Sequence, residues 1–243
     1  MSFPTDIYHE WPLNRIHLEW AILVSQDYRL GDTGFRSDVT RYARQMMRKA
    51  GDLFKMIIEQ LDQQDYRFVN PNGPLSPPEY QIADRIAEFR NRQIFLPVAL
   101  EAWLCEIGTI DLTGSHPDWN KSGYDFGDHT TMSEIIVTDA FVCDVTVDYV
   151  DYLYKEWLSL DGHQRIPFRI DFSPDHLHKA NVSGGPPYQL AAQAPGIDAL
   201  VLNERHCLSF VGLIRLALRW RGFPGFEQIP NEGCWSTIQQ PVI

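Results

Sequence analysis

The sequence of 243 residues lacks the features that mark secreted and membrane proteins. Its first residues contain neither a basic start nor a following apolar run, so we expect no secretory signal peptide. The longest apolar stretches, such as residues 20–24, are far shorter than the ~18 residues that span a bilayer. We therefore expect a cytoplasmic protein without a membrane-spanning helix.

Cysteine is scarce and scattered. The four cysteines are Cys105, Cys143, Cys207 and Cys234, and no two form the Cys-x-x-Cys pair of zinc ribbons and thioredoxins. Isolated cysteines in a reducing compartment behave as small apolar side chains, so we expect them to be buried. His206 precedes Cys207, but adjacent residues on a helix point ~100° apart, which argues against a nucleophile and base there.

Common catalytic and nucleotide-binding signatures are also absent. The sequence contains no G-x-G-x-x-G, Walker A, G-x-S-x-G or H-E-x-x-H motif. The leading interpretation therefore includes no cofactor and no metal.

Positive charge is in short supply, and the negative excess is local. Lys and Arg number 21 and Asp and Glu 32, for a net charge of −11. Nucleic acids and anionic membrane surfaces are held by clustered Lys and Arg, so the charge argues against both as direct partners. Residues 101–175 contain 15 acidic and 4 basic side chains, which equals the whole excess. A local excess of negative charge bears on which partners the protein can bind, and it says little about the fold.

The composition is that of a globular protein, with 44% hydrophobic and 22% charged residues. Apolar residues at helical spacing predict helices. The predicted helices are 13–25, 37–64 with a break at Gly51-Asp52, 79–92, 97–107, 145–160 and 209–220. Shorter apolar or alternating runs predict strands. The predicted strands are 109–112, 140–143, 166–172 with Pro167 marking an edge, 188–191 and 199–202.

Two regions follow from this pattern. Residues 1–75 are predicted to be helical, and the Pro- and Gly-rich stretch 66–78 is predicted to be a linker. Residues 76–243 mix helices with short strands and are predicted to form an α+β domain, in which an antiparallel sheet is flanked by helices. Residues 113–138 interrupt that order as an insertion.

Residues 80–112 carry a resemblance to a known family. A helix ends near Arg92, the Leu96-Pro97 step opens a helix with Trp103, and Gly108 leads into a strand. This order resembles the opening of the SUKH superfamily, which includes the fungal Smi/Knr cell-wall regulators and many bacterial immunity proteins. Asp139-Ala-Phe-Val-Cys before an aromatic helix is similar to the family's middle section. The resemblance extends over residues 76–243 at most.

The resemblance implies a non-enzymatic protein-binding module of the immunity type. Many bacterial members neutralise a toxin, often a nuclease, whose basic cleft holds phosphate. An acidic surface suits such a partner and speeds association by electrostatic steering.

Acidic residues of the central third are the candidate binding site. Asp144, Asp148 and Asp151 recur at helical spacing, with Glu156 just beyond. Like charges one turn apart repel by a few tenths of a kcal/mol, roughly, which a cationic partner would offset. A solvent-facing helix surface without a partner is the alternative. Three further candidates, Asp118, Asp125 and Asp128, lie in the insertion.

A metal-dependent hydrolase is a second hypothesis. Asp171, His176 and His178 would share a site if the two histidines lay on one strand face. Ser173-Pro174-Asp175 instead predicts a turn or helix start, which would separate the two rings.

A self-associating scaffold, such as a homodimer, is a third hypothesis. Arg41, Arg44 and Arg48 lie together on one face of the predicted helix. That face could pair with the acidic third, either within one chain or between two copies.

Overall fold

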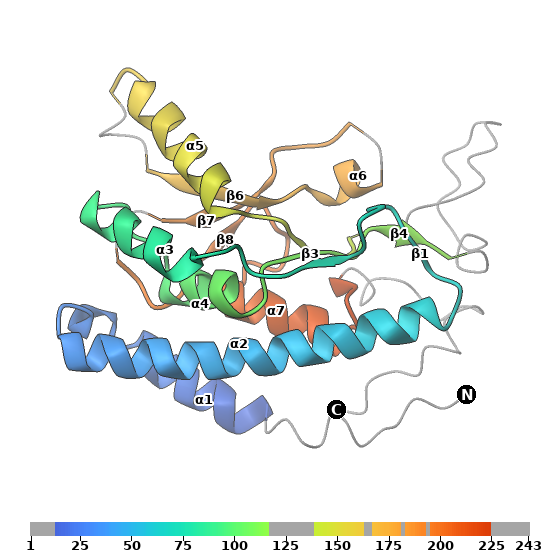
Figure 1. Cartoon of the computed structure of the whole chain (residues 1–243), viewed down its shortest axis with the longest axis horizontal. Coiled ribbons are helices and arrows are strands. Elements are labelled where there is room, and N and C mark those ends of the chain that lie inside the picture. Colours follow the sequence, from blue (N-terminus) through green and yellow to red (C-terminus); the bar gives the residue numbers. More distant parts are fainter. Residues whose placement is uncertain (1–12, 117–138, 163–166, 181–182, 193–194, 225–243) are drawn as a thin grey trace.

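Helices provide most of the regular structure in the computed structural model, which describes residues 13–116, 139–162, 167–180, 183–192 and 195–224 (Figure 1). None of the helices in these ranges is both long and apolar enough to cross a membrane. The helices are α1 (Leu13–Val24), the 3-10 helix η2 (Asp27–Arg29), α2 (Thr33–Asp62), α3 (Ile82–Asn91), α4 (Val98–Glu106), α5 (Val147–Ser159), α6 (His176–Lys179) and α7 (Phe210–Arg219).

The strands of the described residues are short and pair antiparallel throughout, which confirms the predicted α+β class. The two-stranded sheet joins β1 (Arg67–Phe68) to β4 (Gly114–Ser115), the second sheet has the order β2 (Leu75–Ser76), β3 (Thr109–Asp111), β5 (Val142–Cys143), and the third has the order β6 (Arg169–Ser173), β7 (Tyr188–Ala191), β8 (Val201–Leu202). The amide of Asp144 donates to the carbonyl of Phe172 at 3.1 Å and so connects the second sheet to the third. Strand β6 lies at an edge of its sheet, as Pro167 predicts.

Helix α2 runs for 30 residues without the predicted break. It begins earlier than predicted because Asp32 caps it, its side chain accepting from the amides of Gly34 and Phe35 at 2.8 and 3.2 Å. Gly51 does not interrupt the helix. A Cβ there would lie 3.2 Å from Cγ1 of Ile107, so the glycine permits the close approach of α2 to the end of α4.

The stretch 66–78 is not the free linker that its prolines predict. Strands β1 and β2 form within it and pair with β4 and β3. Gly108, at φ +90°, lies so close that a Cβ would come within 2.3 Å of the Ser76 carbonyl oxygen. Backbone pairing therefore ties the residues around the predicted boundary to the rest of the sheet.

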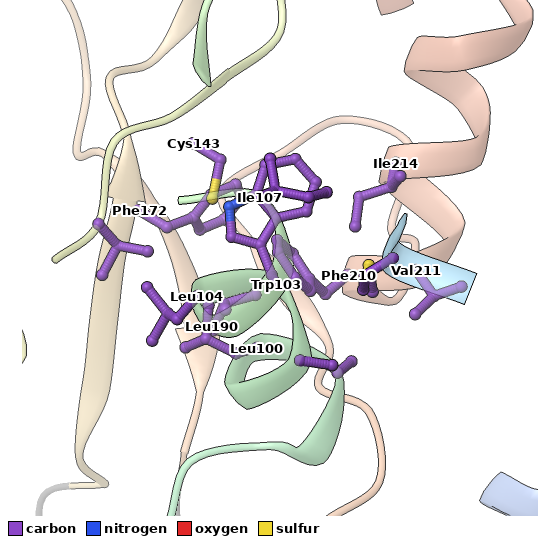
Figure 2. Packing of buried hydrophobic residues seen from close by; sticks show 14 of the residues in the cluster. Leu100, Trp103, Leu104, Ile107, Cys143, Phe172, Leu190, Phe210, Val211 and Ile214 are labelled. Atoms are coloured by element: carbon purple, nitrogen blue, oxygen red, sulfur yellow. The ribbon is translucent and has the colours of Figure 1, made fainter. Parts of the chain in front are cut away.

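One hydrophobic cluster joins the described residues before and after this stretch. Helix α4 is buried on nearly every side and lies, together with α7, between α2 and the strands (Figure 1). At its centre the Trp103 ring is fully buried and lies beside Phe210 of α7 (Figure 2). It also contacts Phe54 of α2 and Phe141, which precedes β5, and the three centroid distances are 5.7 to 6.0 Å. Aromatic contacts of this kind stabilise the core beyond the effect of burying apolar area.

Candidate functional site

Helix α5 carries most of the predicted binding residues and is lightly anchored. Thr146 caps it by accepting from the Tyr149 amide at 3.2 Å. Only Val147 and Val150 of this helix are fully buried. The far end is held by partly buried rings, since Tyr154 and Trp157 pack on Phe168 with centroids 5.3 and 5.7 Å apart. Leu153 is partly buried against the core as well, and the remaining side chains of the helix are half-buried or exposed.

Two of the predicted acidic residues are paired within the chain. Asp148, whose side chain is 83% exposed, forms an ion pair with Arg85 of α3. Asp151 lies 2.6 Å from both Arg92 and Lys155. These contacts hold α5 against α3, so part of the negative charge counted in the sequence is neutralised locally.

Replacing Asp151 with asparagine should cost less than ~1 kcal/mol of unfolding free energy, because its two cationic partners are largely exposed. Hydrogen bonds from Lys155 and then Arg92 lower the pKa of Asp151 against the opposing effect of burial. A lowered pKa stabilises the fold above the unfolded value of about 3.9, and the benefit is lost as the pH falls through the folded value.

Urea unfolding from pH 7 to pH 2.5 measures this effect. The difference in unfolding free energy between wild type and Asp151→Asn should shrink as the pH falls below about 4. Glu156→Gln, on the exposed side of the same helix, is the control and should show little difference throughout. A difference that grows on acidification would contradict the assignment.

The other two predicted residues of this region, Asp144 and Glu156, are exposed. Asp144 stands just before the helix cap. Although the residue reaches the surface, partial burial of its carboxyl raises its pKa, and Asp111 adds to the rise.

Between these carboxylates lies an aromatic pair that the charge pattern alone does not reveal. Tyr149 and Tyr152 are 38% and 55% exposed, and their rings stack with centroids 6.3 Å apart. Burial raises the pKa of Tyr149, and so do the neighbouring Asp171 and Asp144. We call Asp144, Asp171, Tyr149, Tyr152 and Glu156 the α5 outer face.

Asp118, Asp125 and Asp128 lie in the segment 117–138, outside the described residues. Their predicted role stays a prediction.

The structure does not bring the hydrolase residues together. Asp171 on β6 accepts from Gln189 at 2.7 Å, while His178 lies 2.7 Å from Asp175, the cap of α6. His176 is exposed on the same short helix. Among the residues with described positions, no three His, Cys, Asp or Glu side chains form a group that could hold a metal ion.

The arginine face of α2 pairs in part with the acidic third of its own chain. Arg48 Nε lies 2.7 Å from Glu106, and Arg44 Nε lies 3.7 Å from the same carboxylate. Arg41 instead pairs with Asp38 on its own helix at 2.6 Å. Two of the three arginines therefore pair within their own chain, and self-association stays a prediction.

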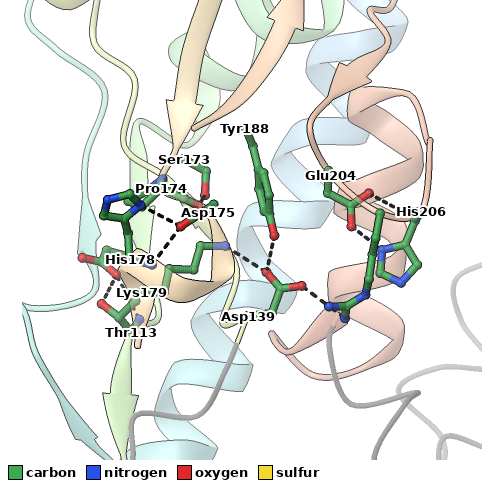
Figure 3. A network of polar contacts seen from close by, with 12 residues as sticks. Thr113, Asp139, Ser173, Pro174, Asp175, His178, Lys179, Tyr188, Glu204 and His206 are labelled. Atoms are coloured by element: carbon green, nitrogen blue, oxygen red, sulfur yellow. Dashed lines mark hydrogen bonds and ion pairs between the residues drawn. The ribbon is translucent and has the colours of Figure 1, made fainter. Parts of the chain in front are cut away.

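A buried polar network, which the sequence does not reveal, centres on Asp139 (Figure 3). Asp139 accepts hydrogen bonds from Lys179 Nζ at 3.2 Å and from the Tyr188 hydroxyl at 3.1 Å, and its other oxygen lies 3.2 Å from Arg205. The Asp139 and Lys179 side chains are each only 2% exposed. Burial lowers the pKa of Lys179 and raises that of Tyr188. The network therefore ties together segments that are far apart in the sequence.

Beside this network, Glu204 accepts from the His206 amide at 2.8 Å and contacts Nδ1 of its ring. The turn that makes these contacts places Asn203 and Cys207 at positive φ. Cys207 is exposed, so the expectation that it is buried is wrong, whereas Cys143 is buried as predicted and Cys105 is half-buried.

Comparisons with protein-family models, with curated proteins and with solved structures find no match to this chain.

Proposed function

We propose that this chain is a protein-binding module whose α5 outer face docks on a basic partner. The observation that carries the proposal is the stacked, exposed pair Tyr149 and Tyr152 set among carboxylates on a lightly anchored helix. Tyrosine is enriched in protein interfaces because it buries a large ring while its hydroxyl still bonds to polar groups. A Lys or Arg side chain of the partner would be attracted both by the carboxylates and by the faces of the tyrosine rings.

The partner class that we propose is a basic toxin, such as a nuclease. Its support is the resemblance of residues 80–112 to SUKH immunity proteins, together with the acidic charge of the central third. Steering by an acidic surface would raise the association rate with such a protein. The proposal requires no catalytic group and no cofactor.

Photo-crosslinking from position 152, in cells of the source organism, is the experiment that tests this proposal. A benzophenone amino acid replaces Tyr152 in one version of the full chain and Lys49, on distant α2, in another (Figure 1). The captured protein is then purified, and its affinity for this chain is measured. A basic protein captured from position 152 and not from position 49 supports the proposal.

Substitutions at the α5 outer face then test the contact itself. Tyr152→Ala should weaken binding by about tenfold or more, as loss of a central interface aromatic does. Glu156→Lys should mainly slow association. Neither residue is a member of the Arg85–Asp148 or Arg92–Asp151 pair, so the helix should stay in place. Unchanged affinity in both variants would contradict the proposal.

A further inference from the structure

A groove lined by arginines lies between α2, α3 and α4. In Figure 1, α2 and α4 lie on one side of α3, and α5 lies on the other. Its volume is about 710 Å³, within the range of ligand sites. The arginines that line it are Arg36, Arg41, Arg44 and Arg48 of α2 and Arg90 of α3. Such a concentration of positive charge is unexpected in a chain whose net charge is −11.

The carboxylates near the groove do not balance these arginines. Glu101, with a side chain only 4% exposed, is shared by Arg36 and Arg90. Glu106 is likewise shared by Arg44 and Arg48. Two carboxylates therefore face four guanidinium groups, and each guanidinium has five N–H donors. Donors are left over for an external anion.

Two of the guanidinium groups, those of Arg41 and Arg48, are well exposed. The side chains of Arg41 and Arg48 are 71% and 59% exposed, and Arg41 pairs with the similarly exposed Asp38 on its own helix. Exposed pairs of this kind contribute little and exchange readily. Arginine binds carboxylates in a two-pronged geometry that lysine cannot offer.

The spacing of the arginines favours an extended ligand. From position 36 to position 48 the helix rises about 18 Å, and its four arginines are five, three and four residues apart, which is about 6 Å of rise on average. Alternate residues of an extended peptide recur about every 6.6 Å, so successive acidic side chains on one edge match that repeat. Ala83, Ile86 and Ala102 give the groove an apolar floor for the peptide's other side chains.

Polar groups between the arginines suit a polypeptide as well. Thr40, Ser37 and Gln45 line the groove and can bond to peptide amides and carbonyls. We propose that this groove binds an extended segment of a partner protein in which acidic residues alternate with small or apolar ones. This site is separate from the α5 outer face and does not depend on the function proposed for it.

Fluorescence anisotropy with a labelled Glu-Ala-Glu-Ala-Glu-Ala peptide, added to the full chain at low salt, tests the proposal. Saturable binding is expected, and a Lys-Ala peptide of equal length should not bind. The variant Arg41→Gln/Arg48→Gln should weaken binding by about tenfold, because it removes two exposed guanidinium groups that would pair with the peptide. Lys49→Gln/Lys55→Gln removes the same charge from other positions on α2 and should bind like wild type.

Four results would overturn the proposal. The first is no binding by folded wild-type protein, and the second is equal weakening in both double variants, which would mark a nonspecific charge effect. The third is tight binding of tripolyphosphate without binding of the peptide, which would make the groove a phosphate site. A dimer that dissociates with added salt and is lost in Arg41→Gln/Arg48→Gln would also overturn it, by placing a second copy in the groove.

Discussion

Replacing Asp139 with asparagine is expected to lower the free energy of unfolding by roughly 3–5 kcal/mol, the usual cost of removing one partner from a buried ion pair. Asp139 is the shared counter-charge of Lys179 and Arg205, and Lys179 is as deeply buried as Asp139 itself. Asparagine is the best probe because Asp139 has φ +63°, a conformation that asparagine tolerates. The change therefore removes charge without adding backbone strain, and urea unfolding measures its cost.

A double-mutant cycle separates the ion pair from other effects of the substitution. Lys179→Met removes the buried ammonium, and Asp139→Asn/Lys179→Met leaves neither charge of the pair. The double variant should recover part of the stability lost in Asp139→Asn, because an uncompensated buried charge is the main source of the loss. If Asp139→Asn costs less than about 1 kcal/mol, or the double variant is simply the sum of the singles, the network does not stabilise the fold as described.

Replacing Trp103 with alanine is expected to lower the free energy of unfolding by a similar ~3–5 kcal/mol, because apolar burial is lost and a cavity remains. The ring is fully buried and touches aromatic side chains from α2 and α7. Because these contacts span the chain, near-UV and far-UV circular dichroism should report one common, lowered unfolding transition. Separate transitions would show that the helices before the predicted boundary fold independently of the rest.

Trp103→Phe is the matched control. The buried Nε1 of Trp103 has no hydrogen-bond partner among the described atoms, so phenylalanine removes an unsatisfied donor while it keeps most of the aromatic contact. We expect this variant to lose much less stability than Trp103→Ala. An equal loss in both variants would mean that the size of the ring, and not the aromatic contact, decides the cost.

Local pattern predicted the long elements well. The helix predicted at residues 209–220 and the strand predicted at 188–191 correspond closely to α7 and β7. These signals are local because helical and strand periodicity depend on neighbours in sequence. The predicted start of α2 at residue 37 was too late, because Asp32 caps the helix and the turn that contains Gly34 is already helical. The pairing of residues 67–68 and 75–76 depends on partners more than 30 residues away.

The pattern of charged residues in the sequence predicted the candidate site only in part. The acidic spacing located α5, but the count of charges could not reveal that Arg85 and Arg92, on another helix, neutralise two of its carboxylates. The buried network was out of reach for the same reason, since Asp139 is 40 residues from Lys179 and 49 from Tyr188. Exposed tyrosines at positions 149 and 152 were the available signal, since their spacing sets them beside Glu156 on one helix face.

The association rate between this chain and the protein captured from position 152 tests the central claim most directly. Stopped-flow measurements at about 20 mM and 200 mM salt should show a rate constant that falls steeply with salt, because exposed charges are screened over about 10 Å or less at the higher value. Glu156→Lys should slow association at low salt, whereas Lys49→Gln on α2 should not. A rate that is the same at both salt concentrations, and unchanged by Glu156→Lys, would contradict binding through the acidic face of α5.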